Sequence, residues 1–330
     1  MNSTFRAFQV NQIDEAFSAN VTMLSVDDLP DTEVLIKVQY SSINYKDALA
    51  TVPNSTIVKH YPFVPGIDLA GIVVESNDTR FKEGDSVIAT SYEIGVSHYG
   101  GFSEYARIPA DWIVPLPEGL SLQEAMIYGT AGFTAALSVH RLENNGLSPQ
   151  DGKVLVTGAT GGVGSMAVAM LAKLGYEVVA STGKHSAHEF LKKIGASEVI
   201  GREDVLADKI KPLDKQLWAG AVDPVGGQTL AAIVSKLKYG GGVAASGLTG
   251  GTQVPTAVFP FILRGVSLLG VDSVYCPMSL RKALWERMAD DLKPVGLQHL
   301  MAGTTTLEKL PQELRRILDG NALGRTVIRL

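Results

Sequence analysis

The chain has 330 residues, of which 45% are hydrophobic, and its formal net charge at pH 7 is −5. This length suits two domains of ordinary size. The mild acidity, without a basic stripe, argues against a nucleic-acid partner. No apolar run approaches the roughly 18 residues of a membrane span, so no membrane partner is expected.

The single cysteine, Cys276, excludes an intrachain disulfide and a thiolate zinc cluster. The first ten residues lack the apolar core of a signal peptide, so we expect a cytoplasmic protein.

Residues 1–120 have the pattern of a small β domain. Apolar runs predict strands at 34–40, 71–75 and 85–89, and proline and glycine punctuate the stretches between them. No long amphipathic helix intervenes. The pattern therefore predicts a mostly antiparallel β domain.

A helical pattern begins at Ser121, which has the capping-box spacing to Glu124, and small residues at 129–140 continue it. From residue 153 onward, strands alternate with helices. We predict buried strands at 154–156, 178–180, 198–201, 220–223, 242–247 and 265–272, then a helix at 307–318 and a last strand at 326–330. This alternation favours an α/β fold with an open, doubly wound parallel sheet.

Residues 153–184 contain a strand, a glycine-rich turn, a helix and a second strand. The turn is GATGGVG at 158–164, and apolar residues then recur on one helical stripe until Gly175 ends the helix. This is the context of the dinucleotide fingerprint GxGxxG, with Ala159 at the first glycine position. Exposed N–H groups at the helix start favour a pyrophosphate. The alternative is a tight turn in an unrelated α/β protein. The predicted cofactor contacts of the turn are Thr160, Gly161, Gly162, Val163 and Gly164.

The end of the second strand distinguishes the two nicotinamide cofactors. An NAD site usually has Asp or Glu there to bind the ribose hydroxyls. This chain instead has Ser181, Thr182, Gly183 and Lys184, so no carboxylate repels a 2′-phosphate and a lysine can pair with it. We predict NADP(H), with Arg202 after the third strand as a further contact. The alternatives are a solvated loop lysine and a surface arginine.

Several segments, in this order, resemble the medium-chain dehydrogenase/reductase superfamily. They are INYKDALA (43–50), PFVPGIDLAGIVVE (62–75), FKEGDSVIA (81–89), GGFSEYARIPADW (100–112), GTAGFTAA (129–136), GATGGVG (158–164), AVDPVGG (221–227) and ALGRTVIRL (322–330). The NYKD and PGIDLAG combination resembles the zinc-free quinone oxidoreductase branch, in particular the YhdH/YhfP and acryloyl-CoA reductase group. This implies a GroES-like β domain at 1–123 and 299–330, and a Rossmann NADP(H)-binding domain at 124–298. It also implies a homodimer formed through residues near 258–275.

The resemblance also shows which positions of this chain would hold zinc ligands. Zinc alcohol dehydrogenases of this superfamily have an early cysteine, a His-Glu pair and a lobe of four cysteines. Here Asn44 stands at the first position, Ile67-Asp68 stands at the pair, and the lobe is absent. We therefore expect no catalytic zinc. Asp68 is interpreted either as a loop hydrogen-bond partner or as a functional residue.

Without a metal, the nicotinamide cofactor supplies the reaction, and the acceptor must already be electrophilic. A quinone, or the activated double bond of an α,β-unsaturated carbonyl or thioester, meets this requirement. Hydride addition leaves an enolate, so the site needs an oxyanion donor and a proton source. The resemblance places Asn44, Tyr45 and Asp47 in the loop that faces the nicotinamide, as catalytic candidates, with Tyr45 also a cofactor contact. The alternative is that Tyr45 packs while Asn44 and Asp47 cap a helix.

Other cofactor contacts are predicted from position. Ser246, Gly247 and Leu248 end one strand and Ser273 follows another, and ligands bind at the carboxyl ends of such strands. Thr130 is expected near the nicotinamide or the pyrophosphate, with helix packing as the alternative. We interpret Arg264 and Arg325 as structural ion-pair residues, with a contact to coenzyme A or the cofactor as the alternative.

The sequence thus predicts an NADPH-dependent, zinc-independent oxidoreductase that acts on a small-molecule quinone or enoyl acceptor. Two other hypotheses are weighed against it. A metal-dependent alcohol dehydrogenase would need zinc ligands that this chain lacks. A non-catalytic NADPH-binding sensor or structural protein would keep the fold without turnover, and the fold alone does not decide between them.

Overall fold

The computed structural model describes residues 4–206 and 210–330. They form two compact units. Unit 1 comprises Met1–Thr130, Val274–Ala289 and Met301–Leu330, and unit 2 comprises Ala131–Ser273 and Asp290–Leu300. The predicted domains were 1–123 with 299–330, and 124–298. The main difference is that residues 274–289 are grouped with unit 1. Contacts of this segment with the rest of unit 1 include the Tyr128 hydroxyl, which donates to the Met288 carbonyl at 2.9 Å, and Arg281, which donates to Thr90.

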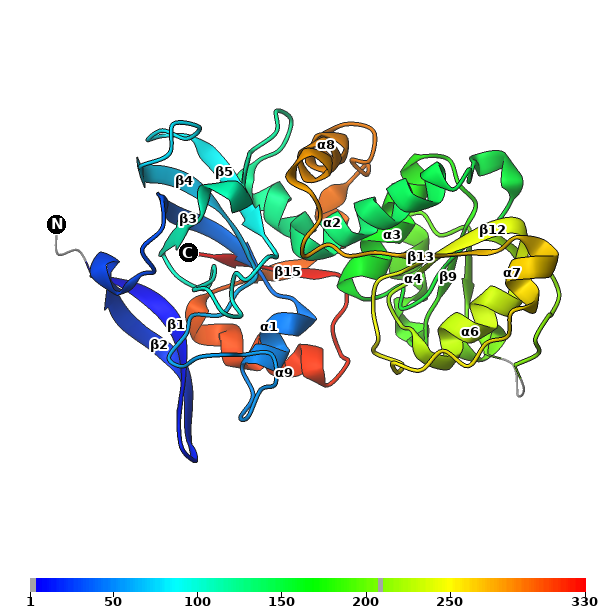
Figure 1. The fold of residues 1–330 in the computed structure, drawn as a ribbon, viewed down its shortest axis with the longest axis horizontal. Coiled ribbons are helices and arrows are strands. Elements are labelled where there is room, and N and C mark those ends of the chain that lie inside the picture. Colours follow the sequence, from blue (N-terminus) through cyan, green and yellow to red (C-terminus); the bar gives the residue numbers. More distant parts are fainter. Residues whose placement is uncertain (1–3, 207–209) are drawn as a thin grey trace. The chain divides into compact units, whose positions relative to one another are not determined.

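Unit 1 is built on a seven-stranded sheet with the order β14-β15-β3-β4-β5-β7, and β6 also pairs with β3. Its strands are β3 (Val34–Ser42), β4 (Asp68–Ser76), β5 (Ser86–Thr90), β6 (Tyr105–Ile108), β7 (Ile113–Pro115), β14 (Met301–Thr305) and β15 (Arg325–Arg329). All pairs are antiparallel except β14 with β15, which confirms the predicted β domain. A separate hairpin joins β1 (Thr4–Ile13) to β2 (Ala16–Ser25) (Figure 1).

The core of unit 1 lies on both faces of this sheet. Along β3 the side chains alternate, so Val34, Ile36 and Val38 join one cluster while Leu35 joins the other. Three helices complete the unit: α1 (Tyr45–Ala50), α8 (Met278–Ala289) and α9 (Leu310–Leu318), the last preceded by a 3₁₀ turn at Leu307–Lys309. Helix α9 packs against α1, which is the helix that carries the predicted catalytic loop.

Unit 2 contains a six-stranded parallel sheet with the order β10-β9-β8-β11-β12-β13. Its strands are β8 (Val154–Val156), β9 (Val178–Ser181), β10 (Glu198–Ile200), β11 (Trp218–Asp223), β12 (Leu237–Ala245) and β13 (Ser267–Gly270). Its helices are α3 (Gly162–Lys173), α4 (His188–Lys193), α5 (Arg202–Val205), α6 (Gly227–Lys236) and α7 (Phe259–Arg264). The strand order reverses next to β8, as in dinucleotide-binding sheets, so the predicted Rossmann fold is confirmed.

Helix α2 (Leu122–Asn144) begins at the predicted capping box. The Glu124 N–H donates to Ser121 Oγ at 3.2 Å, and the Ser121 N–H donates to Glu124 Oε2 at 2.9 Å. The helix is interrupted at Gly129, whose φ is 51° and ψ is −157°. In the part of the chain that the structure describes, no helix is both long and apolar enough to cross a membrane.

Candidate active site

The three predicted catalytic residues lie at the start of α1: Asn44 is the N-cap, and Tyr45 and Asp47 belong to the first turn of the helix. The Asp47 carboxylate accepts the Asn44 N–H at 2.7 Å and the Ile67 N–H at 2.8 Å, and its side chain is fully buried. Asp47 therefore makes the contacts of a helix cap, which was the alternative interpretation. Tyr45 is the first residue of α1 and is 47% exposed, so unit 1 leaves its ring open to a ligand.

Asp68, at the start of β4, is the centre of a buried hydrogen-bond network. Its Oδ2 accepts from Ser42 Oγ at 2.6 Å and from Asn44 Nδ2 at 2.7 Å. Its Oδ1 accepts from Thr130 Oγ1 at 2.5 Å, and the Thr130 N–H lies 2.9 Å from both carboxylate oxygens. Thr130 thus belongs to this network, and its predicted approach to the cofactor stays a prediction.

Arg325, the first residue of β15, enters the same network with its side chain only 3% exposed. It lies 3.7 Å from Asp68 Oδ2 and donates to Asn44 Oδ1 at 3.1 Å and to Ser42 Oγ at 2.8 Å. It also donates to the carbonyls of Ile43 and Ile127. The predicted structural ion pair of Arg325 is confirmed. Because Asn44 accepts from Arg325 and donates to Asp68, the orientation of its amide is fixed.

Gly129 is a site residue that the sequence interpretation missed. A Cβ at this position would lie 2.3 Å from Asp68 Oδ2, 2.5 Å from Ser42 Oγ and 2.8 Å from Arg325 Nη2. Its positive φ also favours glycine. The network therefore closes directly against the helix backbone. The available signal was a glycine inside a helical pattern, next to Thr130.

The electrostatics of the network follow from its burial. Burial, and after it the neighbouring Asp68 carboxylate, raises the pKa of Asp47 to about 7. Burial lowers the pKa of Arg325, whereas Asp68 and Asp47 act in the opposite direction. Two carboxyl groups and one guanidinium are therefore buried near one another, and only Asp68 forms an ion pair with Arg325. With a proton on Asp47 the cluster is neutral, which reduces the cost of burying it.

These residues do not fit a zinc ion. Asn44 and Asp68 stand where the resemblance placed zinc ligands, but they are hydrogen-bonded to each other and both contact the Arg325 guanidinium. A buried cation already lies beside these oxygens, and a second cation would be repelled. Across residues 4–206 and 210–330, no group of three or more His, Cys, Asp or Glu side chains is arranged to hold a metal.

In unit 2 the predicted fingerprint turn connects β8 to α3. A Cβ at Gly164 would lie 2.3 Å from the Gly158 carbonyl oxygen, so this close approach of helix and turn requires glycine. Helix α3 begins after Gly161, which places residues 160–164 at its N-terminus. Ala159 is fully buried and donates its N–H to the Ser181 carbonyl at 3.2 Å, so a methyl group fits there. N–H groups at the start of a helix are the kind of donor that binds a pyrophosphate, and the predicted contact of this turn stays a prediction.

The residues predicted to hold the 2′-phosphate are brought together at the end of β9. The Lys184 N–H donates to Thr182 Oγ1 at 3.1 Å, and Thr182 donates its own N–H to the Ile200 carbonyl at 3.0 Å. A Cβ at Gly183 would lie 3.0 Å from Arg202 Nε, so the guanidinium of Arg202 lies beside this loop. Ser181 is buried, and its hydroxyl donates to the Gly201 carbonyl at 3.3 Å.

The remaining predicted contacts follow β12 and β13. A Cβ at Gly247 would lie 2.1 Å from the Pro224 carbonyl oxygen, so the segment after β12 approaches the backbone after β11 closely there. Leu248 is 63% exposed, and Ser273 is half-buried beyond β13. Ser246 Oγ is buried and, within the described residues, has no hydrogen-bond partner. A buried hydroxyl without a partner at the carboxyl end of a strand fits a site that a ligand completes.

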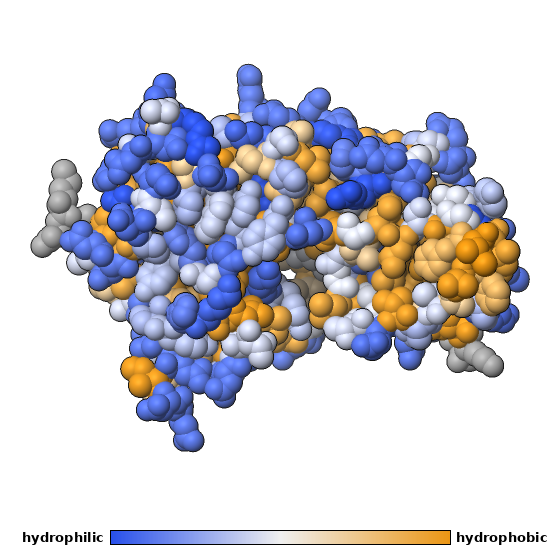
Figure 2. Space-filling model, in the orientation of Figure 1, coloured by the Kyte–Doolittle hydropathy of each residue, from blue (hydrophilic) through white to orange (hydrophobic). Residues whose placement is uncertain are grey.

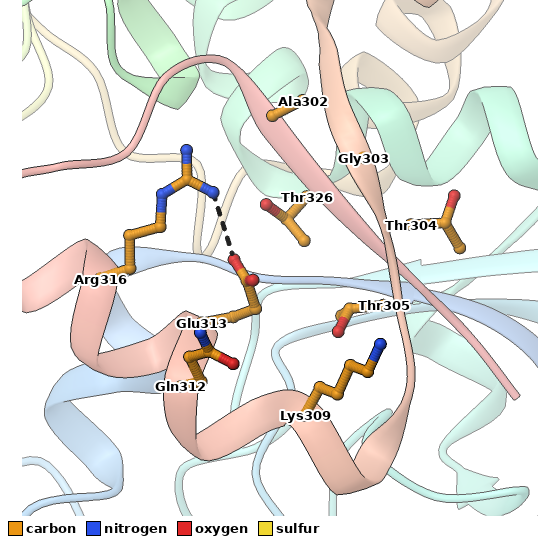
Figure 3. A pocket seen from close by; sticks show the side chains of 9 residues that line it. All are labelled: Ala302, Gly303, Thr304, Thr305, Lys309, Gln312, Glu313, Arg316 and Thr326. Carbon is orange, nitrogen blue, oxygen red and sulfur yellow. Dashed lines mark ion pairs between the residues drawn. The ribbon is translucent and has the colours of Figure 1, made fainter.

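A separate pocket lies between α9 and the strands β14 and β15, and it contains none of the predicted site residues (Figure 3). Arg316 and Glu313 of α9 both line it and form an ion pair at 3.6 Å along the helix. Thr326 lines it. Because successive strand residues point to opposite faces, Thr326 and the neighbouring Arg325 serve different sides of the sheet.

Two family models match the chain in agreement with this architecture. The model described as the alcohol dehydrogenase GroES-like domain matches residues 30–118, and the model described as zinc-binding dehydrogenase matches residues 162–290. A GroES-like domain together with a Rossmann domain defines the class. The chain therefore belongs to the medium-chain dehydrogenase/reductase superfamily.

Three relatives place the chain more narrowly. YhfP of Bacillus subtilis, which carries a quinone oxidoreductase name, is 61% identical over 330 residues, 100% of both chains. Its crystal structure with NAD bound has a TM-score of 0.98 and covers 99% of this chain and 100% of that one. Acrylyl-CoA reductase AcuI of Ruegeria pomeroyi is 48% identical over 98% of both chains. The yhdH oxidoreductase of Salmonella enterica, in complex with NADP, is 46% identical, covers 98% of this chain and 99% of that one, and has a TM-score of 0.95. Within the superfamily, the chain belongs to the group that contains YhfP, YhdH and AcuI, and it is an oxidoreductase.

Proposed function

We propose that the chain is an NADPH-dependent, zinc-independent reductase that acts on the activated double bond of an α,β-unsaturated carbonyl or thioester, or on a quinone. The observation that carries this proposal is the neutral Asn44–Asp68–Arg325 network beneath an exposed Tyr45. The Asp68 carboxylate already faces the Arg325 guanidinium, which supports an acceptor that needs no Lewis acid. The names of AcuI and YhfP support the same two classes of acceptor.

The structure of unit 2 suggests how NADPH is held. The start of α3 presents main-chain N–H groups to the pyrophosphate, whereas the Gly161 N–H is donated to the Gly158 carbonyl at 2.9 Å. Lys184 and Arg202, with Ser181, Thr182 and Gly183, supply the 2′-phosphate site. Ser246 Oγ, Gly247, Leu248 and Ser273, together with Thr130 of unit 1, are the remaining proposed contacts. The relatives were crystallised with either NADP or NAD, and the two basic residues here favour the phosphorylated cofactor.

When bound, the reduced nicotinamide supplies the hydride. The phenol of Tyr45 donates a hydrogen bond to the carbonyl oxygen of the acceptor, where negative charge develops. The polar atoms of Asn44 and Asp47 are already engaged, so these residues act by holding the loop that carries Tyr45. Residues 44–47 thus contain both the proposed oxyanion donor, Tyr45, and the two residues that hold it in place, Asn44 and Asp47.

We also propose a homodimer formed through residues 258–275. Large apolar side chains are exposed there, and Figure 2 shows the corresponding hydrophobic surface over α7. They are Val258, Phe259, Ile262, Leu263 and Leu268. Strand β13 is the edge of the sheet, and unpaired edges are suited to pairing with a second copy. Arg264 fixes α7 by donating to the carbonyls of Ser235, Leu237 and Asp214.

The proposed function is tested by measuring NADPH oxidation with acryloyl-CoA and 1,4-benzoquinone side by side, after metal analysis of the same preparation. Turnover without stoichiometric zinc supports the proposal, and the ratio of kcat/KM values identifies the preferred acceptor. Tight NADPH binding with no turnover of either acceptor would instead indicate a non-catalytic NADPH-binding protein. Activity that requires bound zinc would contradict the proposal.

A further inference from the structure

The turn that follows β5 is strained at two consecutive residues. Ser91 has a φ of 67° and Tyr92 a φ of 49°, although neither is glycine. The left-handed conformation brings a side chain too close to its own backbone, and it is rare for a bulky residue such as tyrosine. Such strain persists only where surrounding contacts impose it, and it concentrates at functional sites.

Arg281 of α8 supplies those contacts. Its side chain is fully buried, and Nη1 donates to the Thr90 carbonyl at 3.3 Å and to Thr90 Oγ1 at 3.1 Å. Its guanidinium carbon lies 4.5 Å from the centre of the Tyr92 ring. The same ring stacks on Trp112, with the ring centres 5.3 Å apart and the planes 6° from parallel. The guanidinium thus holds the residues before and after Ser91 at the same time.

Ser91 of this strained turn is also hydrogen-bonded to the Asp68 network. The Ser91 N–H donates to the Ile67 carbonyl at 2.8 Å, which fixes the turn beside the start of β4. Ser91 Oγ lies 3.0 Å from Thr130 Oγ1, and the Thr130 hydroxyl donates to Asp68 Oδ1 at 2.5 Å. A continuous series of contacts therefore runs from Arg281 through Ser91 and Thr130 to the carboxylate beneath the Tyr45 loop.

We propose that Arg281 is a positioning residue for the reaction. By keeping Ser91 and Tyr92 in the left-handed turn, it holds Ser91 Oγ against Thr130. This contact keeps the Thr130 hydroxyl on Asp68 and the carboxylate oriented toward Asn44 and Arg325. This inference rests on the proposed function. It adds a helix outside the predicted site, α8, to the machinery that fixes the Tyr45 loop.

Two variants test this role, Arg281→Met and Ser91→Ala, with Arg281→Lys as the conservative replacement. We expect both test variants to lower kcat by about tenfold to a hundredfold, because small misplacements of a supporting group have effects of this size. The Kd for NADPH should change by less than kcat does, since Thr130 is one proposed cofactor contact and those in unit 2 are untouched. Arg281→Lys should recover part of kcat, because an ammonium group keeps a positive charge over the Tyr92 ring.

Arg80→Met is the matched control, because Arg80 also lies near an aromatic ring, Phe81, at 6.0 Å, but is half exposed. It should leave kcat at the wild-type value. The inference is overturned if Ser91→Ala, folded and with a wild-type thermal midpoint, also keeps the wild-type kcat. Should Arg281→Met fail to fold, Ser91→Ala decides the question. A wild-type protein without turnover would contradict the proposed function itself. The failure of the proposed function can therefore be distinguished from the failure of the inference about Arg281.

Discussion

The guanidinium of Arg325 lies 3.7 Å from the carboxylate of Asp68, and both side chains are excluded from solvent. The contact joins the first residue of β15 to the first residue of β4 in a sheet where β3 separates the two strands. A buried ion pair of this kind is costly to form and more costly to break, because removing one partner leaves an uncompensated buried charge.

Replacing Asp68→Asn should therefore destabilise the protein strongly. The variant keeps the shape of the side chain but leaves the Arg325 charge without its main partner, which is expected to lower the free energy of unfolding by about 3–5 kcal/mol. Urea denaturation measures the effect. Asp111→Asn is the matched control, because Asp111 pairs with Arg80 at 2.8 Å and is exposed, and it should leave the urea midpoint unchanged. Equal changes in the urea midpoint for the two substitutions would show that the buried ion pair contributes no more to stability than the exposed one.

Gly129→Ala should disrupt the same network from the helix side. The added methyl group would lie 2.3 Å from Asp68 Oδ2 at a residue whose φ is +51°. Either the network or the helix must move, so we expect loss of activity and a lower thermal midpoint. Gly84→Ala provides the comparison, since its φ is +93° but nothing lies within 4 Å of the added Cβ. That variant should lose only the roughly 1–2 kcal/mol of a left-handed alanine and keep its activity. Full activity in Gly129→Ala would contradict the packing described here.

The pKa of Asp47 predicts a pH dependence of stability. An aspartate in the unfolded chain titrates near pH 3.9, whereas the pKa of Asp47 in the folded protein is raised to about 7. Between these values the folded state binds more protons, so the contribution of Asp47 to stability falls as the pH rises from about 4 to about 7. The stability advantage of the wild-type protein over Asp47→Asn should therefore shrink across this range. Urea midpoints of both proteins at several pH values check this, and parallel curves would rule it out.

Cofactor discrimination should depend on Lys184 and Arg202. Replacing either with alanine removes a cation beside the Gly183 loop, and we expect the Kd for NADPH to rise by about tenfold or more while the Kd for NADH changes little. Nicotinamide fluorescence measures both constants. Lys215→Ala, at an exposed residue remote in sequence from this loop, should affect neither constant. An equal rise of the Kd values for NADH and NADPH would mean that these residues do not bind the 2′-phosphate.

Much of the fold was predictable because its signals are local. The strand at 154–156, the glycine turn and the capping box at Ser121 are each set by residues close together in sequence, and all are confirmed. The buried network was only partly predictable. Arg325 and Ser42 are separated by 283 positions, and no periodic pattern links them. The need for glycine at position 129 arises from atoms of distant segments, so it became visible only in the folded structure.

In the proposed reaction, the Tyr45 hydroxyl donates a hydrogen bond to the acceptor during hydride transfer from NADPH. The most direct test is the initial rate of acryloyl-CoA reduction by the wild-type protein and by Tyr45→Phe, with Tyr239→Phe, another exposed tyrosine, as the control. We predict that Tyr45→Phe lowers kcat by about a hundredfold, as loss of one oxyanion donor typically does, with an unchanged Kd for NADPH. A wild-type kcat in Tyr45→Phe, equal to that of the control, would contradict the proposed role of Tyr45.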